Sequence, residues 1–217
     1  SNNIMFATKI WGLRATDIMQ GVVFGTRIDA MADDPRLCTR LDFDQAFGTA
    51  INRFCCQSVI GHPLTPYGKG HQKRGFLPLC DSMQCLTLAI ENPSGPGEYR
   101  VFNQFENVYD ITQLALMVQG VAADLGLPVE IRNLDNPRQE LEEHYFNPDR
   151  KHLIDLGYQP TQDMKAELRV MLSDLILQRD RIEAKREALI PDVHWNGARG
   201  KVQFIQQKTV AMSDPTG

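Results

Sequence analysis

The sequence predicts an α/β layered fold, because segments typical of strands alternate along the chain with segments typical of helices. The chain has 217 residues, of which 42% are apolar, so it can bury one substantial core, or one domain and part of another. No internal repeat interrupts the alternation. These features argue against disorder over most of the length and favour helices packed on sheets.

The first sixty residues predict a helix, a strand, an excursion and a second helix, in that order. Residues 1–9 have the pattern of the end of a helix already in progress, which suggests that upstream sequence has been lost. β-Branched and apolar residues bounded by glycines predict a buried strand within 12–25 that runs into a loop. The mixed charges of 26–41 predict a mobile excursion, and 43–60 predicts a helix that ends at Gly61.

The middle of the chain predicts short strands around a glycine-rich turn. Residues 64–67 and 75–79 have the composition of extended segments. Asp81 is placed to cap a helix that continues through Ile90. A further strand is expected over 99–105, after a turn rich in proline and glycine.

Capping residues and apolar periodicity predict the remaining elements. Asp110 and Gln113 form a capping-box pair before a helix that Gly126 ends. A strand is expected over 129–134. Apolar residues at helical spacing predict one long amphipathic helix over 163–188.

Composition restricts the classes of function. The net charge of −4 gives no overall positive field for nucleic acid. No apolar run is long enough to span a membrane, and no secretion signal is visible. The five cysteines are odd in number and lack C-x-x-C spacing, which argues against a disulfide framework or a metal site and favours reduced thiols. Small-molecule or protein partners are therefore expected.

The segment 67–76 carries the strongest local signal for a ligand. Gly68 and Gly70 allow a tight turn that a ligand can approach closely, and the guanidinium of Arg74 offers a planar fork of donors to phosphate oxygens. The spacing of these glycines and Gly75 differs from the dinucleotide fingerprint G-x-G-x-x-G. Two interpretations stay open: one wall of a nucleoside diphosphate site, or an ordinary turn followed by a surface arginine.

Several short blocks occur in one order along the chain: RATDIMQG at 14–21, FGTA at 47–50, GHPLT at 61–65, NPR at 136–138 and EEHY at 142–145. Their combination resembles the UDP-sulfoquinovose synthase family, and the resemblance covers residues 1 to about 196. Phe24 stands where that family often has Tyr, and Pro66 interrupts another matching segment. These departures leave the fine substrate preference open.

The resemblance implies a fold and a division of the chain. The expected fold is the C-terminal portion of a Rossmann-type extended short-chain dehydrogenase/reductase, with the last strands of the sheet and a small α/β substrate-binding domain. Residues 1–196 would form this part, and 197–217 would be a flexible tail. The family's dinucleotide loop, catalytic Thr and Tyr-x-x-x-Lys pair would lie upstream, so no catalytic residue is expected in this chain.

The resemblance also implies an activity. The enzyme would bind NAD, oxidise UDP-glucose at C4, eliminate water across C5 and C6, and add sulfite at C6 before the hydride returns. The product would be UDP-sulfoquinovose, the donor for sulfolipid biosynthesis. Two alternatives are another NAD-dependent nucleotide-sugar epimerase or dehydratase, and a non-catalytic nucleotide-sugar-binding module. The complete enzyme would be a homodimer in the cytoplasm, or in the plastid stroma of a photosynthetic eukaryote.

The resemblance and the local residue pattern together give six candidate substrate-binding residues, which are Gln20, Thr49, Tyr67, Arg74, Arg138 and Glu140. Gln20 matches a sugar contact, and the two arginines match a pair that binds the diphosphate through charge-assisted hydrogen bonds. Tyr67 lies at the matching uridine edge, Thr49 near phosphate or ribose, and Glu140 near a ribose hydroxyl. Each position also has a structural alternative, such as a surface ion pair for an arginine or simple packing for Tyr67.

Overall fold

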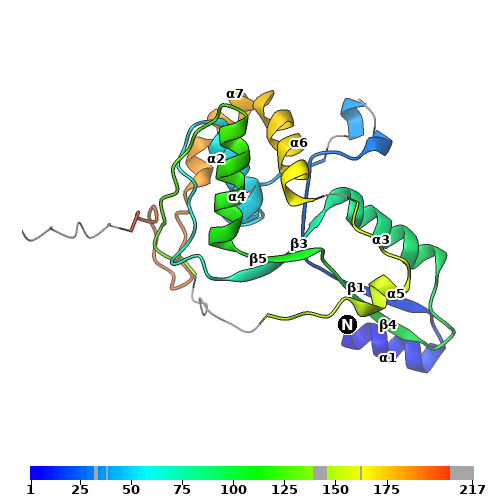
Figure 1. The fold of residues 1–217 in the computed structure, drawn as a ribbon. Coiled ribbons are helices and arrows are strands. Elements are labelled where there is room, and N and C mark those ends of the chain that lie inside the picture. The colour runs from blue at the N-terminus through cyan, green and yellow to red at the C-terminus, as the bar shows by residue number, and fades with distance from the viewer. Residues whose placement is uncertain (32–33, 38, 139–145, 162, 206–217) are drawn as a thin grey trace, which may run out of the picture.

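The structure is a computed structural model that describes residues 1–31, 34–37, 39–138, 146–161 and 163–205. Its strands form two small sheets (Figure 1). In the first, β1 (Ala15–Gln20) pairs in parallel with β4 (Tyr99–Gln104), with Gln20 opposite Gln104 at the end of the register. In the second, β3 (Lys73–Pro78) is parallel to β2 (Val22–Phe24) and antiparallel to β5 (Asn107–Asp110).

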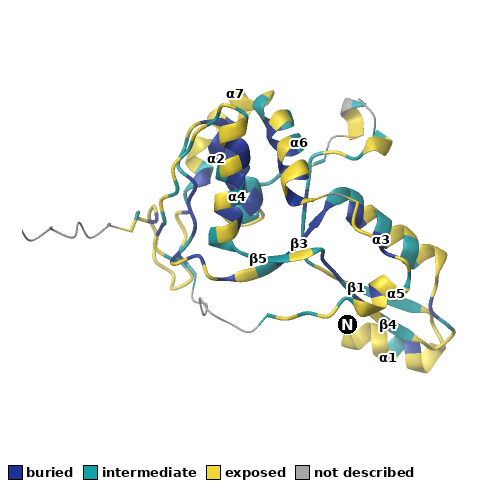
Figure 2. Cartoon of the chain, in the orientation of Figure 1, coloured by how far each residue is buried: buried dark blue, intermediate teal, exposed yellow. Residues whose placement is uncertain are grey.

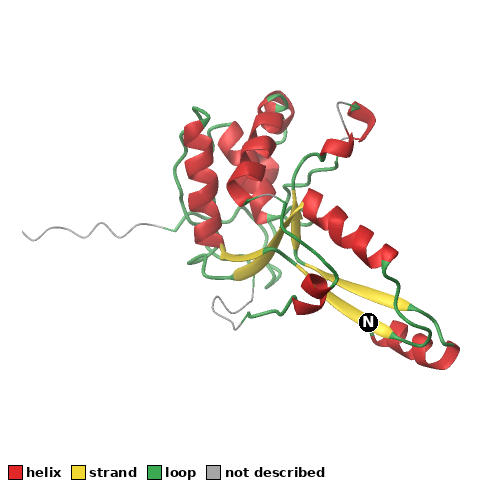
Figure 3. Ribbon diagram, turned by 45° about the vertical axis from the view of Figure 1, so that its right-hand side comes forward, coloured by secondary structure: helices red, strands yellow, loops and turns green. Residues whose placement is uncertain are grey.

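Helices pack on one another at one end of the molecule and cover the sheets elsewhere (Figures 1 and 3). The mutually packed helices are α2 (Ala50–Val59), α4 (Ile111–Asp124) and α6 (Met164–Ile176). The others are α1 (Asn2–Trp11) on β1 and β4, α3 (Leu79–Glu91) on β2 and β3, α5 (Lys151–Asp155) on β4, and the short α7 (Arg179–Glu183). Short 3₁₀ turns cover Asp29–Met31, Pro35–Leu37 and Arg186–Leu189. The α/β architecture expected from the sequence is confirmed.

The main hydrophobic core lies where α2, α4 and α6 meet (Figure 2). Phe54, Leu114 and Leu172 are fully buried there. A smaller cluster around Leu77 and Leu153 lies beneath α3 and α5. Burial of several large side chains at the helical end supplies most of the apolar stabilisation of this fold.

The segment predicted as one buried strand over 12–25 is two strands that belong to different sheets. Gly21 separates them: its N–H donates to the Gln104 carbonyl at 2.8 Å, and the chain then leaves β4 to pair with β3. A Cβ at Gly21 would lie 2.7 Å from the Gly75 carbonyl oxygen. β1 is also half-buried or exposed, so the expectation of a buried strand was wrong there.

Two predicted helix boundaries differ from the structure. The helix expected over 43–60 begins only at Ala50, because the Asp44 carboxylate accepts hydrogen bonds from the N–H groups of Ala46 and Phe47 and holds a turn. The helix expected over 163–188 ends at Ile176, where the N–H of Gln178 bonds to the carbonyl three residues back, and a separate α7 follows.

Asp81 does not cap a helix. α3 begins at Leu79, and Asp81 lies fully buried in its first turn. Its carboxylate accepts hydrogen bonds from the N–H of Thr161, at 3.0 Å, and from the Tyr158 hydroxyl, at 3.2 Å. Glu106 also accepts from Tyr158, at 3.0 Å, and burial raises the pKa of that phenol. Asp81 therefore joins α3 to the segment that precedes α6.

The capping box at the start of α4 is confirmed. The Asp110 side chain accepts from the N–H of Gln113 at 2.7 Å, and the Gln113 side chain accepts from the N–H of Asp110 at 3.0 Å. The strands predicted over 64–67 and 129–134 are reduced to two isolated parallel bridges, which join Leu64 to Ile131 and Tyr67 to Leu134. The sequence analysis did not predict β5, a strand of four residues that its pairing with β3 defines.

Glu167 on α6 is a buried carboxyl group with an unpartnered oxygen. The residue is 3% exposed, and its Oε1 has no hydrogen-bond partner among the described residues. A Cβ at Gly25 would lie only 2.6 Å from that oxygen, so the carboxyl group is packed against the backbone. Burial, with the charges of Asp174 and Asp81, raises the pKa of Glu167 to about 7, and Arg27 opposes this rise.

Replacing Gly21 with alanine tests the close approach between the two sheets. Gly21→Ala is expected to lower the free energy of unfolding by roughly 1–3 kcal/mol, because the new Cβ would meet a backbone oxygen. Gly120→Ala is the matched control: nothing lies within 4 Å of its Cβ position inside α4, so it should stabilise by about 0.5–1 kcal/mol. Equal effects of the two substitutions in urea denaturation would contradict this account.

The pH dependence of stability tests the state of Glu167. Its pKa is raised in the folded protein, so the native state binds the proton more tightly and stability falls as pH rises from 4.5 to about 7. Glu167→Gln is therefore expected to stabilise the protein by roughly 1–3 kcal/mol at about pH 8 and to change it little near pH 4. Glu130→Gln, at an exposed position, should stay within about 0.5 kcal/mol at both. Urea denaturation at the two pH values measures this, and a pH-independent difference would argue against it.

Candidate functional site

Two arginines and two aromatic side chains alternate in a stack beside α2. The guanidinium carbon of Arg53 lies 4.2 Å from the ring centre of Tyr67, and that of Arg138 lies 5.7 Å from the same ring. Arg138 also lies 5.7 Å from the ring of Trp195. The stack runs from a buried end at Arg53, which is 5% exposed, to Trp195, which is 61% exposed. We call these four residues the Arg–aromatic stack.

Backbone pairing brings Tyr67 and Arg138 together from distant parts of the sequence. Tyr67 forms a parallel bridge with Leu134, and the N–H of Gly68 donates to the Leu134 carbonyl at 2.8 Å. Arg138 follows four residues after Leu134, and its N–H donates to the Asn136 side-chain oxygen at 3.1 Å. This local turn directs the chain back along the stack.

The C-terminal part of the described chain holds the outer end of the stack. The N–H of Trp195 donates to the Pro137 carbonyl at 2.8 Å. Phe204 forms an antiparallel bridge with Leu134, and Val202 is 4% exposed. Val202 and Phe204, in the segment expected as a tail, therefore pack against the rest of the protein, while the domain boundary at 196 stays a prediction.

Arg53 is a buried cation that no described carboxylate neutralises. Its two terminal nitrogens donate to the Tyr67 hydroxyl at 2.7 Å and to the Thr65 carbonyl at 3.0 Å, while Nε has no partner. Burial lowers the pKa of Arg53, and the nearby positive charge of Arg138 adds to this effect. A buried charge without a counter-ion is costly, so the position favours an anion from outside.

A second pair of buried side chains fixes the acceptor of Arg53. Gln57 and Thr65 are both fully buried. The Gln57 amide donates to the Thr65 hydroxyl at 2.7 Å and accepts from the Thr65 N–H at 3.1 Å. These bonds hold the Thr65 carbonyl where Arg53 needs it, so the guanidinium is oriented before any ligand arrives.

The arrangement can bind an anionic group. Arg53 and Arg138 both contact the Tyr67 ring, and among the described residues neither has an ion pair with a carboxylate. Guanidinium groups bind phosphate oxygens through planar pairs of donors, and aromatic faces orient those groups. The Trp195 ring next to Arg138 is exposed to solvent.

The structure places the six predicted site residues in different surroundings. Tyr67 and Arg138 lie in the Arg–aromatic stack. Thr49 is the N-cap of α2, and its hydroxyl oxygen accepts from the N–H of Asn52 at 3.3 Å. Glu140 lies outside the described residues.

The other two predicted residues lie on strands. The Gln20 side chain, at the end of β1, donates to the Ser82 hydroxyl at 3.2 Å. Arg74 lies in β3 opposite Tyr109 and donates to the Lys73 carbonyl at 2.8 Å. Their roles toward a ligand stay predictions.

Sequence reasoning missed Arg53. The signal was present, because Arg53 precedes Phe54, Cys55 and Cys56 in a helix with few charges. Arginine is almost never fully buried unless it is paired, so an arginine on an apolar helix face indicates a built polar contact. The partner itself could be found only from the fold.

Among the described residues, no group of three or more His, Cys, Asp or Glu side chains could hold a metal ion. Over the same residues, no helix is long and apolar enough to cross a membrane. The acidic residues and the histidine at 140–144 lie outside this part of the chain.

The solved structures that this chain resembles include nucleotide-sugar epimerases. UDP-N-acetylglucosamine 4-epimerase from Methanobrevibacter ruminantium has a TM-score of 0.64 at 19% identity, covering 82% of this chain and 51% of the other. UDP-glucuronic acid 4-epimerase from Bacillus cereus, solved with UDP-glucuronic acid and NAD, has a TM-score of 0.60 at 19% identity, covering 82% and 50%. At this identity the likeness shows the fold, and the predicted Rossmann-type class is confirmed.

The similarity to curated sequences is much higher. No family model matches the chain. UDP-sulfoquinovose synthase from Sulfolobus acidocaldarius is 44% identical over 199 residues, covering 92% of this chain and 49% of that protein. The chloroplastic UDP-sulfoquinovose synthase of Spinacia oleracea is 45% identical over 206 residues, covering 95% and 42%. The chain thus spans about half the length of these relatives, and it belongs to the UDP-sulfoquinovose synthase family.

Proposed function

We propose that this chain forms the UDP-sugar-binding part of an enzyme that makes UDP-sulfoquinovose from UDP-glucose and sulfite. The observation that carries this proposal is the Arg–aromatic stack, in which two guanidiniums flank Tyr67 without a described counter-ion. The names of the two relatives at 44% and 45% identity support the choice of reaction. The sugar would pass through a 4-keto intermediate and accept sulfite at C6, for sulfolipid biosynthesis.

The diphosphate is proposed to lie against Arg138, at the open part of the stack. Arg53 would add positive potential from behind Tyr67, where its charge is desolvated. Arg74 is proposed to complete the diphosphate contacts from β3, with Gln20 at the sugar. Thr49 and Glu140 are kept as proposed contacts to phosphate or ribose.

NAD is proposed as the cofactor, because the epimerase from Bacillus cereus that shares this fold was solved with it. The chain has no G-x-G-x-x-G sequence, and the described residues hold no such strand–turn–helix unit for a dinucleotide pyrophosphate. The residues present therefore do not form its main site. We assign substrate binding to this chain and place most NAD contacts in protein outside it.

The proposed partners and location follow the relatives. We propose that the complete enzyme is a homodimer, and that it acts in the cytoplasm or, in a photosynthetic eukaryote, in the plastid stroma. The spinach relative is named chloroplastic, which supports the second setting.

Binding of UDP-glucose tests the proposed role of the stack. Arg138→Ala is expected to weaken binding by roughly 1.5–3 kcal/mol, because a charged hydrogen-bonding group is lost. Arg132→Ala is the matched control: Arg132 lies six residues earlier and also contacts a ring, that of Phe204, at 4.4 Å. Isothermal titration calorimetry measures both variants. Equal affinities of Arg138→Ala and the wild-type chain would place the diphosphate elsewhere.

Product formation tests the proposal that the catalytic residues lie outside this chain. The 217-residue chain with UDP-glucose, NAD and sulfite is expected to give no UDP-sulfoquinovose. A fusion of the N-terminal half of the Sulfolobus relative to this chain is expected to form it, as measured by mass spectrometry, and Arg138→Ala should reduce the yield. A fusion that binds UDP-glucose but yields only an epimerised sugar would contradict the proposed reaction and favour a nucleotide-sugar epimerase.

A further inference from the structure

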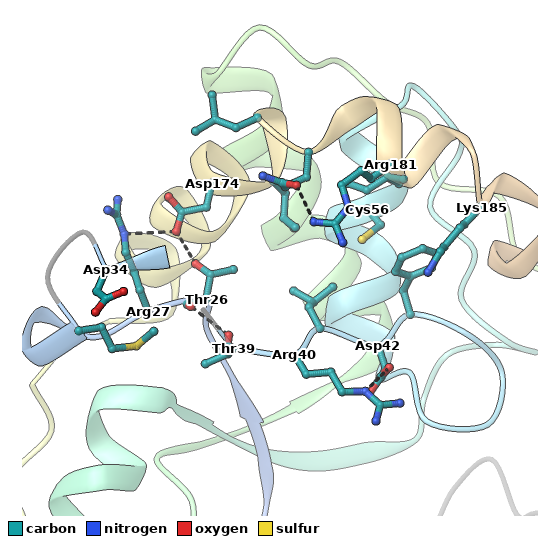
Figure 4. A pocket seen from close by; sticks show the side chains of 17 residues that line it. Thr26, Arg27, Asp34, Thr39, Arg40, Asp42, Cys56, Asp174, Arg181 and Lys185 are labelled. Carbon is teal, nitrogen blue, oxygen red and sulfur yellow. Dashed lines mark hydrogen bonds and ion pairs between the residues drawn. The ribbon is translucent and has the colours of Figure 1, made fainter. Parts of the chain in front are cut away.

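A separate cavity lies between the described residues of the segment 26–43 and the face formed by α6 and α7 (Figure 4). Its volume is about 690 Å³, within the range typical of small-molecule sites. Leu41 and Phe43 line one wall, and Leu175 and Ile182 line the other. The site is therefore a partly open space between two elements, with apolar side chains on both walls.

Every acidic side chain in the cavity wall already has a cationic partner. The pairs are Arg36 with Asp34 at 2.5 Å, Arg40 with Asp42 at 2.9 Å, and Arg27 with Asp174 at 3.2 Å. The Thr26 hydroxyl also donates to Asp174, at 2.6 Å. These carboxylates have little remaining capacity to attract a cationic ligand.

Two cations in the wall remain without a counter-ion among the described residues, Arg181 and Lys185. They stand four residues apart, one in the middle of α7 and one two residues beyond its end. The described polar contact of Arg181 is to the Gln178 side-chain oxygen, at 3.1 Å. Figure 4 shows the Arg181 side chain directed into the cavity, near Cys56, with Lys185 on the same side. Both are solvent-accessible, so a ligand can reach them.

Cys56, at the back of the cavity, adds an apolar surface. Burial raises the pKa of its thiol to about 12, so the sulfur carries no negative charge at neutral pH. An anion beside Arg181 would therefore meet no repulsion from this side chain.

We propose that this cavity binds a small organic oxyanion, with its charged group at Arg181 and Lys185 and its apolar part against Leu41, Phe43 and Ile182. Carboxylates, sulfonates and phosphate esters share the required chemistry. The site is distinct from the Arg–aromatic stack, because Arg53, Tyr67, Arg138 and Trp195 do not line the cavity.

Titration of the 217-residue chain with benzoate, benzenesulfonate and phenyl phosphate tests the proposal by isothermal titration calorimetry. At least one of these anions is expected to bind, and the neutral analogue benzamide to bind roughly tenfold more weakly. Arg181→Gln and Lys185→Gln should each weaken the anion by about tenfold. Arg179→Gln is the matched control, because Arg179 is an exposed arginine of the same helix that does not line the cavity.

Several results would overturn the proposal. These are the absence of binding by all three anions, equal binding of benzamide, or equal losses in Arg181→Gln and Arg179→Gln. Equal affinities of inorganic phosphate and phenyl phosphate would show that the apolar wall does not contribute to binding. UDP is not expected to displace the bound anion, and displacement would assign the cavity to the nucleotide site. If Arg181→Gln folds poorly by circular dichroism, Arg181→Lys, which keeps the charge, should retain binding.

Discussion

The close approach of Gly21 and Gly75 is the constraint on which the two sheets depend. At this point β1 ends beside β4 and β2 begins beside β3, so one backbone serves both sheets within two residues. A Cβ on Gly21 would lie 2.7 Å from the Gly75 carbonyl oxygen, and one on Gly75 would lie 2.9 Å from Cβ of Phe105. Glycine at both positions allows the chain to pass from one sheet to the other at Gly21. This passage in turn fixes the position of β3 and of α3, which follows it.

The proposed binding site contains a buried charge, which lowers stability. Arg53 is 5% exposed and has an unpartnered Nε, which costs stability in the absence of a ligand. The face of Tyr67 and the Thr65 carbonyl offset part of this cost. In the proposed site this charge would favour an anionic ligand, so the same side chain would lower stability without the ligand and raise affinity for it.

Local signals predicted part of this structure, and tertiary contacts decided the rest. The capping box of Asp110 and Gln113 was predictable because both partners lie within one helical turn. Asp81 looked like a cap by the same logic, but its partners come from about eighty residues away, at Thr161 and Tyr158. The resemblance identified Tyr67 and Arg138, which the fold brings together. Arg53 was missed although it lies on an apolar helix face, because its partners Thr65 and Tyr67 are brought to it only by the fold.

Hydrogen bonds join the segment that lines the cavity to residues near the Arg–aromatic stack in the sequence. The Asn52 side chain on α2 donates to the carbonyl of Asp42, in the cavity wall, at 3.0 Å. Three residues after Asp42, the Gln45 side-chain amide donates to the Asp192 carboxylate at 2.9 Å and accepts from the Asp192 N–H at 2.9 Å. Asp192 leads directly to Trp195 at the outer end of the stack. An anion in the cavity would therefore affect UDP-sugar binding only if it reorganised this link, because coupling requires an element with two arrangements that both sites bias.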